Sequence, residues 1–331
     1  MKTMTGVVWT DGEPLVRHDL TRPEPGPGEV LVQVTHATVN GHEIEVAESA
    51  FLRLVGRAMG ARGEVVTGLE FAGVVRSSGE TYVPGDPVLG YVNMTRGWRP
   101  HGAFIAIAEA QLARRPAQLS AVDASALSMS GQTALVALRD IAGVGAGDSV
   151  MVLGASGGVG VLAVQIARIL GARVTAVAKE THHALLSRLG AHTVMDSADL
   201  DLARLRGKHA LILDMTTTHR YRHVRHLLSD DGCFIPANPL NCLLDVATRR
   251  QVRYLWVDKG HAAKLEELAA WAASGSLEMV IDAVYSMGEV APAFERARAR
   301  GKAGRVVLEI SAPGPEPLRA DSLRGGATRA T

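Results

Sequence analysis

Cysteine is scarce in this chain, because only Cys233 and Cys242 occur among its 331 residues. Two thiols are too few for a disulfide framework, and the first residues include Asp11 and Glu13 in place of the apolar core of a signal peptide. Both absences predict a protein of the reducing cytoplasm. Aromatic residues are also few, at 4% of the chain, which argues weakly against a binding platform of stacked rings.

An excess of charge of either sign is missing as well. The 35 basic side chains almost balance the 34 acidic ones, so no global field would attract nucleic acid or an anionic membrane. The most apolar stretch, 150–178, contains Arg168, Arg173 and five glycines. It therefore predicts a buried strand and helix and not a membrane span. A small-molecule partner is the favoured expectation, in a chain long enough for two domains.

The stretch 150–171, VMVLGASGGVGVLAVQIARILG, is the strongest single motif. An apolar strand, a glycine-rich turn and a helix with a buried face follow one another, as in an A-x-G-x-x-G dinucleotide fingerprint. The helix N-terminus would offer free N–H groups to phosphates. The alternative is a glycine-rich turn in another nucleotide-binding or methyl-transfer sheet. The predicted cofactor contacts of the turn are Ala155, Ser156, Gly157, Gly158, Val159 and Gly160.

Short strands separated by turn residues fill the chain up to about residue 107 and predict an irregular antiparallel β-barrel. Strand and helix then alternate to about residue 256, with a sixth and last parallel strand predicted at 253–257. β character returns near the C-terminus, at 280–285 and 306–310. The expected fold class is therefore α/β, with a doubly wound parallel sheet of the Rossmann type inserted in a β-barrel domain.

The predicted limits follow from these changes of pattern. The Rossmann domain should occupy 122–275, and the barrel domain should combine 1–121 with 276–311. The tail 312–331 is poor in large apolar residues and is expected to be disordered.

The order of motifs resembles the medium-chain dehydrogenase/reductase superfamily, and within it the zinc-free quinone oxidoreductase and enoyl reductase branch. The motifs that carry the resemblance are Val39-Asn40, GLEFAGVV at 68–75, GDPVLG at 85–90, GAF at 102–104, GQTA at 131–134, GASGGVG at 154–160 and GKAGRVVL at 301–308. The resemblance implies a GroES-like barrel domain, a Rossmann domain, and a cleft between them where a nicotinamide meets the substrate. It also implies a homodimer, which an apolar edge at 253–257 would favour.

Zinc-dependent relatives use a cysteine in the first loop, a Gly-His-Glu motif and a lobe with four closely spaced cysteines. Asn40 and Leu69 stand at the first two places here, and the lobe is missing. Zinc prefers thiolate or imidazole ligands in a fixed number, so we expect no metal. Glu70 remains from the motif and is expected to be a structural carboxylate.

The resemblance places Thr133 beside the nicotinamide carboxamide and Asn40 on the floor of the substrate cleft. The alternatives are a threonine that bonds its own helix and an asparagine at a turn. His42 could titrate near neutral pH and act as an acid, or it could be a surface histidine. Glu45 stands where relatives often have a tyrosine. Asn40, His42 and Glu45 are thus the candidate catalytic residues, with Glu43 as a further polar neighbour.

An acidic residue at the end of the second Rossmann strand would select NAD. Ala178 occupies that position, and Lys179 follows. We expect Lys179 and His182 to face a 2′-phosphate, which predicts NADPH, although Glu180 could serve as the missing acid and Lys179 could be solvated. Asn238 and Lys302 complete the predicted cofactor contacts.

Two functions from different classes follow. The first is an NADPH-dependent reductase that transfers hydride to an activated double bond or carbonyl of an enone, quinone or ketone. The second is a sensor or partner-binding module that holds NADPH without turnover.

Overall fold

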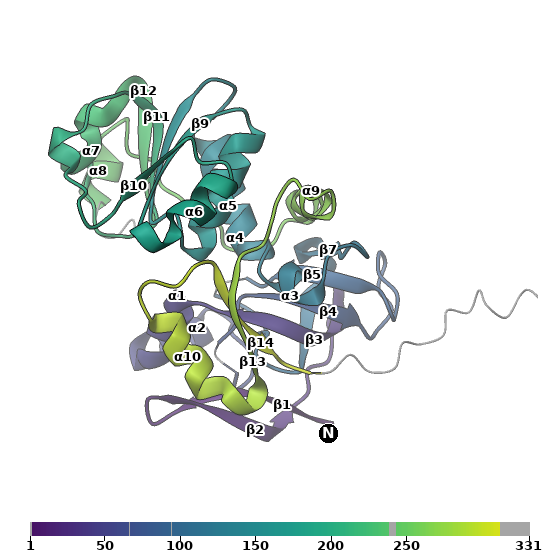
Figure 1. The fold of residues 1–331 in the computed structure, drawn as a ribbon. Helices are drawn as coiled ribbons and strands as arrows, with labels where there is room; N and C mark the ends of the chain where they lie inside the picture. Colours follow the sequence, from purple (N-terminus) through teal and green to yellow (C-terminus); the bar gives the residue numbers. More distant parts are fainter. Residues whose placement is uncertain (1, 66, 94, 238–242, 312–331) are drawn as a thin grey trace, which may run out of the picture.

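A computed structural model describes the chain except for residues 1, 66, 94, 238–242 and 312–331. Figure 1 shows two lobes, one built from the first third of the chain together with its last described segment, and one from the middle of the chain. The predicted disorder of 312–331 and the site residue Asn238 therefore lie outside the described residues. No helix within the described ranges is long and apolar enough to cross a membrane.

The first lobe is built mainly on antiparallel strands, and β13 pairs with β14 in parallel. β1 pairs with β2, and a larger sheet has the order β13-β14-β3-β4-β5-β7, with β6 paired to β3. Val306 of β14 lies opposite Val39 of β3, so the C-terminal segment completes the sheet begun by the N-terminal one. The strands are β1 Thr3–Thr10, β2 Glu13–Thr21, β3 Glu29–Val39, β4 Glu70–Val75, β5 Pro87–Tyr91, β6 Phe104–Ala108, β7 Leu112–Arg114, β13 Ile281–Ser286 and β14 Arg305–Glu309.

The second lobe contains a parallel sheet with the strand order β10-β9-β8-β11-β12. The order reverses at β8, which is the doubly wound arrangement. Its strands are β8 Ser149–Leu153, β9 Arg173–Ala178, β10 Thr193–Asp196, β11 His209–Asp214 and β12 Leu228–Pro236. The predicted fold class, a doubly wound sheet inserted in a β-barrel domain, is confirmed by this topology, while the limits at 121/122 and 275/276 stay predictions.

Helices cover the sheets and connect the lobes (Figure 1). The helix predicted at 262–273 is confirmed as α9, and α4 continues into a π-helical turn at Val136–Ile141. The α-helices are α1 Gly41–Glu48, α2 Ala50–Ala58, α3 Ala121–Ser125, α4 Ser128–Leu135, α5 Gly158–Ile169, α6 His183–Arg188, α7 Tyr221–Val224, α8 Leu243–Thr248, α9 Ala262–Ala273 and α10 Val290–Arg298.

The prediction of a sixth parallel strand at 253–257 is wrong. Val252 forms a single bridge to Phe234 of β12, and residues 253–257 form no strand. Leu255 turns inward to the main apolar core, while Trp256 is 51% exposed. The apolar alternation therefore reflects packing of an irregular segment against the core, and it no longer supports dimerisation through a sheet edge.

Candidate active site

The glycine-rich turn between β8 and α5 has the close packing that the fingerprint requires. A Cβ atom at Gly160 would lie 2.4 Å from the carbonyl oxygen of Gly154, so only glycine allows the helix to begin so near the strand. Gly154 has a φ of +76°, which glycine adopts without strain. Gly157 caps α5, whose first N–H groups have no acceptor inside the helix. The turn can therefore bind an anion through backbone N–H groups.

The segment before β14 is fixed against this turn. The N–H of Gly304 donates to the carbonyl oxygen of Ser156 at 2.8 Å, and Gly304 forms a parallel bridge with Gly157. Arg305 follows directly and lies over the start of α5, because a Cβ atom on Gly158 would be 2.3 Å from the Arg305 Nε. The structure thus places a guanidinium beside the N-terminus of α5, where an anionic ligand would need a positive charge.

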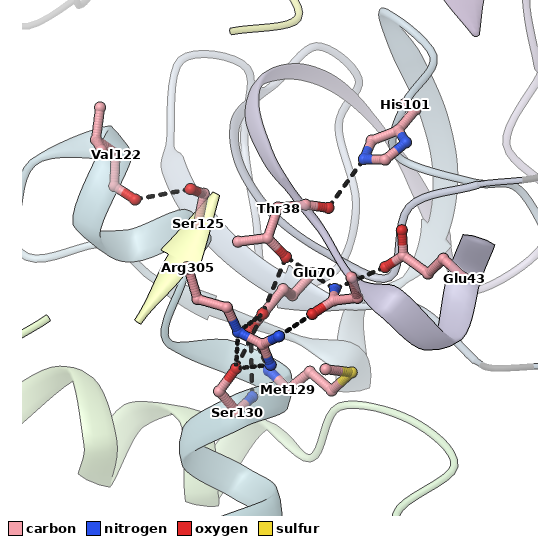
Figure 2. Close-up of polar contacts among 10 residues, drawn as sticks. Thr38, Glu43, Glu70, His101, Val122, Ser125, Met129, Ser130 and Arg305 are labelled. Carbon is pink, nitrogen blue, oxygen red and sulfur yellow. Dashed lines mark hydrogen bonds and ion pairs between the residues drawn. The ribbon is translucent and has the colours of Figure 1, made fainter. Parts of the chain in front are cut away.

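Arg305 is the centre of a buried polar network that joins the two lobes (Figure 2). Its Nε donates to Ser130 Oγ at 2.8 Å and lies 3.3 Å from Glu70 Oε1, while its Nη1 donates to Asn40 Oδ1. Ser130 belongs to α4 and Glu70 to β4, while Asn40 lies between β3 and α1. Residues that are distant in sequence therefore meet where the barrel lobe faces the glycine-rich turn.

Glu70 is the acidic member of this network, and its side chain has no exposed surface. It accepts hydrogen bonds from Thr38 Oγ1 at 3.0 Å, from Ser130 Oγ at 3.0 Å, and from the backbone N–H groups of Met129 and Ser130 at 2.8 and 3.3 Å. Two of these donors belong to the first turn of α4, where a carboxylate stabilises the helix. Glu70 therefore holds the network together, as a structural carboxylate would.

The side-chain amide of Asn40 makes all its hydrogen bonds to other groups of the protein. Its Nδ2 donates to Thr38 Oγ1 at 3.0 Å and to Glu43 Oε1 at 2.7 Å, while its Oδ1 accepts from Arg305. The residue is 3% exposed and caps α1. Both N–H donors are occupied in this structure, so Asn40 connects Arg305 to Glu43; its contact with a substrate stays a prediction.

Glu43 is the titratable group of the site. It lies in the first turn of α1 and is buried, and its Oε2 accepts from the N–H of Gly68 at 3.0 Å. Burial raises the pKa of this carboxyl to about 7, although the hydrogen bonds from Asn40 and Gly68 act in the opposite direction. Glu43 can therefore exchange a proton near neutral pH.

His101 is a second buried titratable residue, and the sequence patterns did not single it out. Its Nε2 lies 2.9 Å from the carbonyl oxygen of Thr38, and its Nδ1 lies 2.9 Å from Thr67 Oγ1. A carbonyl can only accept, so Nε2 carries the proton and Nδ1 accepts from the hydroxyl. Burial lowers the pKa of His101 to about 4. The imidazole is therefore neutral at physiological pH, and its hydrogen bond to the carbonyl oxygen of Thr38 holds that residue in place.

The other predicted catalytic residues lie on α1. Glu45 is exposed, unlike Glu43 two positions earlier. His42 belongs to the first turn of α1, and its side chain lies outside the described part of the structure. Thr133 is half-buried in α4, and its neighbour Gln132 donates to the carbonyl oxygen of Lys259 at 2.7 Å. The catalytic roles proposed for these residues stay predictions.

The predicted cofactor residues outside the glycine turn divide into two groups. Lys179 follows β9 and is exposed, with its Nζ 3.0 Å from the point where a Cβ of Gly301 would lie. His182 has a buried Nε2 without a hydrogen-bond partner in the part of the chain that is described. Lys302 instead donates to the carbonyl oxygens of Ala297 and Ala299 at the end of α10. Lys179 and His182 thus remain available to a ligand, whereas the ammonium of Lys302 caps a helix.

The raised pKa of Glu43 predicts a pH-dependent stability. A carboxyl with a raised pKa holds its proton more tightly in the folded protein than in the unfolded one, and this difference stabilises the fold. The stabilisation is complete below about pH 4.5 and is lost as the pH rises through 7. At about 1.4 kcal/mol per pKa unit, the loss is about 3 kcal/mol. Glu43→Gln should remove this pH dependence. The free energy of unfolding of the wild type, relative to that of the variant, should therefore fall by about 3 kcal/mol between pH 4.5 and 8.

Urea unfolding at a series of pH values measures this difference. His101 has the opposite dependence, since its lowered pKa gives stability above about pH 6.5 that is lost as the pH falls through 4. That contribution is common to both proteins and cancels in the difference. A difference that stays constant across the range would show that Glu43 does not titrate as proposed.

Comparison with known proteins agrees with this architecture. Residues 26–110 match the family described as the alcohol dehydrogenase GroES-like domain, and residues 189–308 match the family described as zinc-binding dehydrogenase. The chain belongs to the medium-chain dehydrogenase/reductase superfamily of oxidoreductases.

The chain matches a small part of some curated relatives and nearly the whole of others. The chain is 30% identical to a mycocerosic acid synthase-like polyketide synthase of Mycobacterium tuberculosis and 31% identical to erythronolide synthase EryA2 of Saccharopolyspora erythraea, over 87% and 86% of its length. It spans only 14% and 8% of those two proteins. It is also 26% identical to the chloroplastic quinone-oxidoreductase QR1 of Triphysaria versicolor, over 87% of this chain and 91% of that one.

Solved structures share the fold. The quinone oxidoreductase from Coxiella burnetii superposes with a TM-score of 0.80 at 22% identity, over 94% of this chain and 100% of that one. The crotonyl-CoA carboxylase/reductase AntE in complex with NADP gives a TM-score of 0.78 at 18% identity, over 93% of this chain and 95% of that one.

Proposed function

We propose that this chain is an NADPH-dependent reductase that transfers hydride to an activated double bond or carbonyl, as in an enone, a quinone or a ketone. The observation that carries the proposal is the glycine-rich turn of the Rossmann lobe, which faces the Arg305 network of the barrel lobe. The names of the relatives support the reaction class, because they include a quinone-oxidoreductase and, among the solved structures, a reductase in complex with NADP.

The residues of the turn fit a dinucleotide. Gly158 and Gly160 leave no room for side chains, and the start of α5 offers N–H groups to a pyrophosphate. Arg305 would supply positive charge at the same place, and His182 has a buried nitrogen that lacks a partner among the described residues. When bound, the nicotinamide would supply the hydride. The protein would orient it with Thr133 and exclude water from the reacting carbon.

The protein groups near the reacting centre have different charges at neutral pH. His101 is neutral, Glu43 has a pKa of about 7, and the Arg305 guanidinium is charged. Asn40 lies between Glu43 and Arg305 and bonds both. We infer that Glu43 buffers a proton within this network and that Arg305 stabilises negative charge on a ligand, which are the two requirements of a reduction completed by protonation.

Anaerobic oxidation of NADPH tests the proposal with a panel of enones, quinones and ketones, followed by absorbance and by mass spectrometry of the products. The alternative of a sensor without turnover is favoured by one observation, namely that both N–H donors of Asn40 are occupied by protein groups. If NADPH binds but no acceptor in a broad panel oxidises it, the sensor function replaces the reductase.

Cofactor choice gives a further prediction. Lys179→Ala should weaken NADPH binding by about tenfold to a hundredfold, because one charge-assisted contact contributes about 1.5–3 kcal/mol. NADH lacks the 2′-phosphate, so its affinity should change little. Calorimetric titration of both cofactors measures this, with Lys208→Ala, an exposed lysine of the same lobe, as the matched control. Equal losses for NADPH and NADH in Lys179→Ala would contradict the assignment.

We propose further that the chain needs no zinc. Asn40 is committed to the Arg305 network and Leu69 is buried, so neither position offers a ligand. Among the described residues, no group of three or more His, Cys, Asp or Glu could hold a metal ion. Elemental analysis after dialysis against chelator should find well below one zinc per chain.

Homodimer formation is also a proposal, supported by the resemblance alone now that 253–257 is not a sheet edge. Light scattering at micromolar concentration should give about twice the chain mass if it holds. A mass equal to that of one chain would contradict the proposed homodimer.

A further inference from the structure

The helix α2 presents its apolar side to solvent. Phe51, Leu54, Val55 and Ala58 share one face of the helix through the spacing i, i+3, i+4 and i+7. Such a face is normally buried against a core, but Phe51 is 70% and Leu54 is 67% exposed, and none of the nine residues of α2 is buried. Figure 1 shows α2 at the outer edge of the barrel lobe. The apolar face of α2 is therefore uncovered by the residues that the structure describes.

Contacts on the polar side of α2 hold the helix in this orientation. The Ser49 hydroxyl caps the helix and accepts from the N–H of Leu52 at 3.2 Å. Arg53, on the side of the helix opposite to Phe51, donates to the carbonyl oxygen of Ala47 near the end of α1. The principal contact of α2 with another helix or strand is with α1. The outward direction of the apolar face therefore follows from the way in which the helix is attached to the barrel lobe.

The border of the apolar face is positively charged. Arg57 of α2 is exposed, and the exposed Arg96 lies against the C-terminal end of the helix, where a Cβ atom on Gly60 would be 3.6 Å from the Arg96 Cγ. Neither arginine forms an ion pair with a described residue. Glu48, the acidic residue nearest to α2 along the chain, is already paired with Arg298. An anionic surface would therefore be attracted locally, although the net charge of the whole chain is only +1.

We propose that the apolar face of α2 docks on the surface of a membrane that contains anionic phospholipids. A helix in the membrane interface places its apolar side among the acyl chains, while arginines at the border reach the phosphate groups of the lipids. A second copy of the chain fits this face less well, because a two-fold interface would bring the arginines of two identical faces together.

The inference is independent of the proposed reductase function, since it uses no residue of the Arg305 network. Docking would nevertheless place the candidate active site near the bilayer. The helix α1 joins Asn40 to the start of α2 and is only about 12 Å long.

Co-sedimentation of the full chain with lipid vesicles tests the proposal. We expect binding to vesicles of equal parts phosphatidylcholine and phosphatidylglycerol, and at least about tenfold weaker binding to vesicles of phosphatidylcholine alone. Binding should also weaken at higher salt, because salt screens the attraction between arginines and lipid phosphates. Absence of binding to the anionic vesicles, or equal binding to both kinds of vesicle, would overturn the proposal.

The double variant Phe51→Ser/Leu54→Ser should weaken binding to the anionic vesicles by at least about tenfold, because two large apolar side chains no longer enter the bilayer. Both side chains are exposed, so the fold should survive. Leu243→Ser/Leu244→Ser changes two exposed leucines of the other lobe and is the matched control, which should bind as the wild type does. If the first variant binds vesicles normally but changes from two chains to one in light scattering, the face covers a second copy and the proposal is wrong.

Two further variants examine the charges and the place of contact. Arg57→Gln/Arg96→Gln should weaken binding to the anionic vesicles by about tenfold to thirtyfold. Phe51→Trp adds a tryptophan to α2, whereas the four tryptophans of the wild type lie outside this helix. Lipids with brominated acyl chains should quench the fluorescence of this variant more strongly than that of the wild type. Equal quenching of the two proteins would show that another face of the molecule meets the membrane.

Discussion

Arg305→Met should lower the free energy of unfolding by about 3–5 kcal/mol, the cost of leaving one member of a buried ion pair without its partner. Glu70 has no exposed side-chain surface, and the Arg305 side chain is 13% exposed. Methionine fills much of the same volume but leaves the carboxylate without its cation. It also removes the hydrogen bonds to Ser130 and Asn40, so NADPH binding should weaken together with stability.

Urea unfolding of the wild type and variant measures the change. The double variant Arg305→Met/Glu70→Gln is the control, because it removes both charges and should recover most of the lost stability. Arg305→Lys should recover little, since a lysine cannot reproduce donors that point to different partners. A single variant that loses less than about 1 kcal/mol would show that the pair is solvated and does not hold the lobes together.

Gly160→Ala should abolish measurable NADPH binding and lower stability by about 1–3 kcal/mol or more. The new Cβ atom would meet the carbonyl oxygen of Gly154 at 2.4 Å and the backbone of Ala155 at 2.8 Å, and backbone atoms cannot move aside as a flexible side chain would. The start of α5 must therefore shift away from β8. That shift displaces the N–H groups that would face the phosphates.

The matched control is Gly145→Ala, in the same lobe. A Cβ atom there would meet nothing within 4 Å, and Gly145 is not among the glycines with a positive φ. Its stability should change by no more than about 1 kcal/mol, with cofactor binding unaltered. Fluorescence titration with NADPH and urea unfolding compare the two variants. Similar behaviour of both would mean that close packing at Gly160 is not needed.

Local patterns were sufficient to predict the strand, turn and helix from β8 to α5. There the spacing of glycines and apolar residues reports directly on the backbone, since a Cβ atom at Gly160 would meet Gly154 and Ala155, only a few residues away. The segment 253–257 shows the opposite case. Its apolar residues satisfy a strand pattern, but Leu255 packs into a core formed by residues far along the chain, and pairing with β12 ends at Val252.

The polar network could not be predicted for the same reason. Arg305 and Asn40 are 265 positions apart, and no local signal relates an arginine at the start of β14 to an asparagine after β3. The sequence favoured Glu45 over Glu43, because Glu45 stands where relatives often have a tyrosine. Their difference depends on which side of α1 faces the barrel, and that is set by packing. His101 lies in an irregular loop whose pattern gave no indication of burial.

The link between Gly304 and Ser156 has a mechanical consequence. Backbone atoms make it, so it survives changes of side chain, and it fixes one point of the Rossmann lobe to the barrel lobe. A second backbone link of the same kind joins the N–H of Gly260 to the carbonyl oxygen of Tyr91 at 2.9 Å. A rotation of one lobe about either link would break the other, so the two links together oppose such a movement. We therefore expect the lobes to keep their relative placement when single side chains at their border are changed.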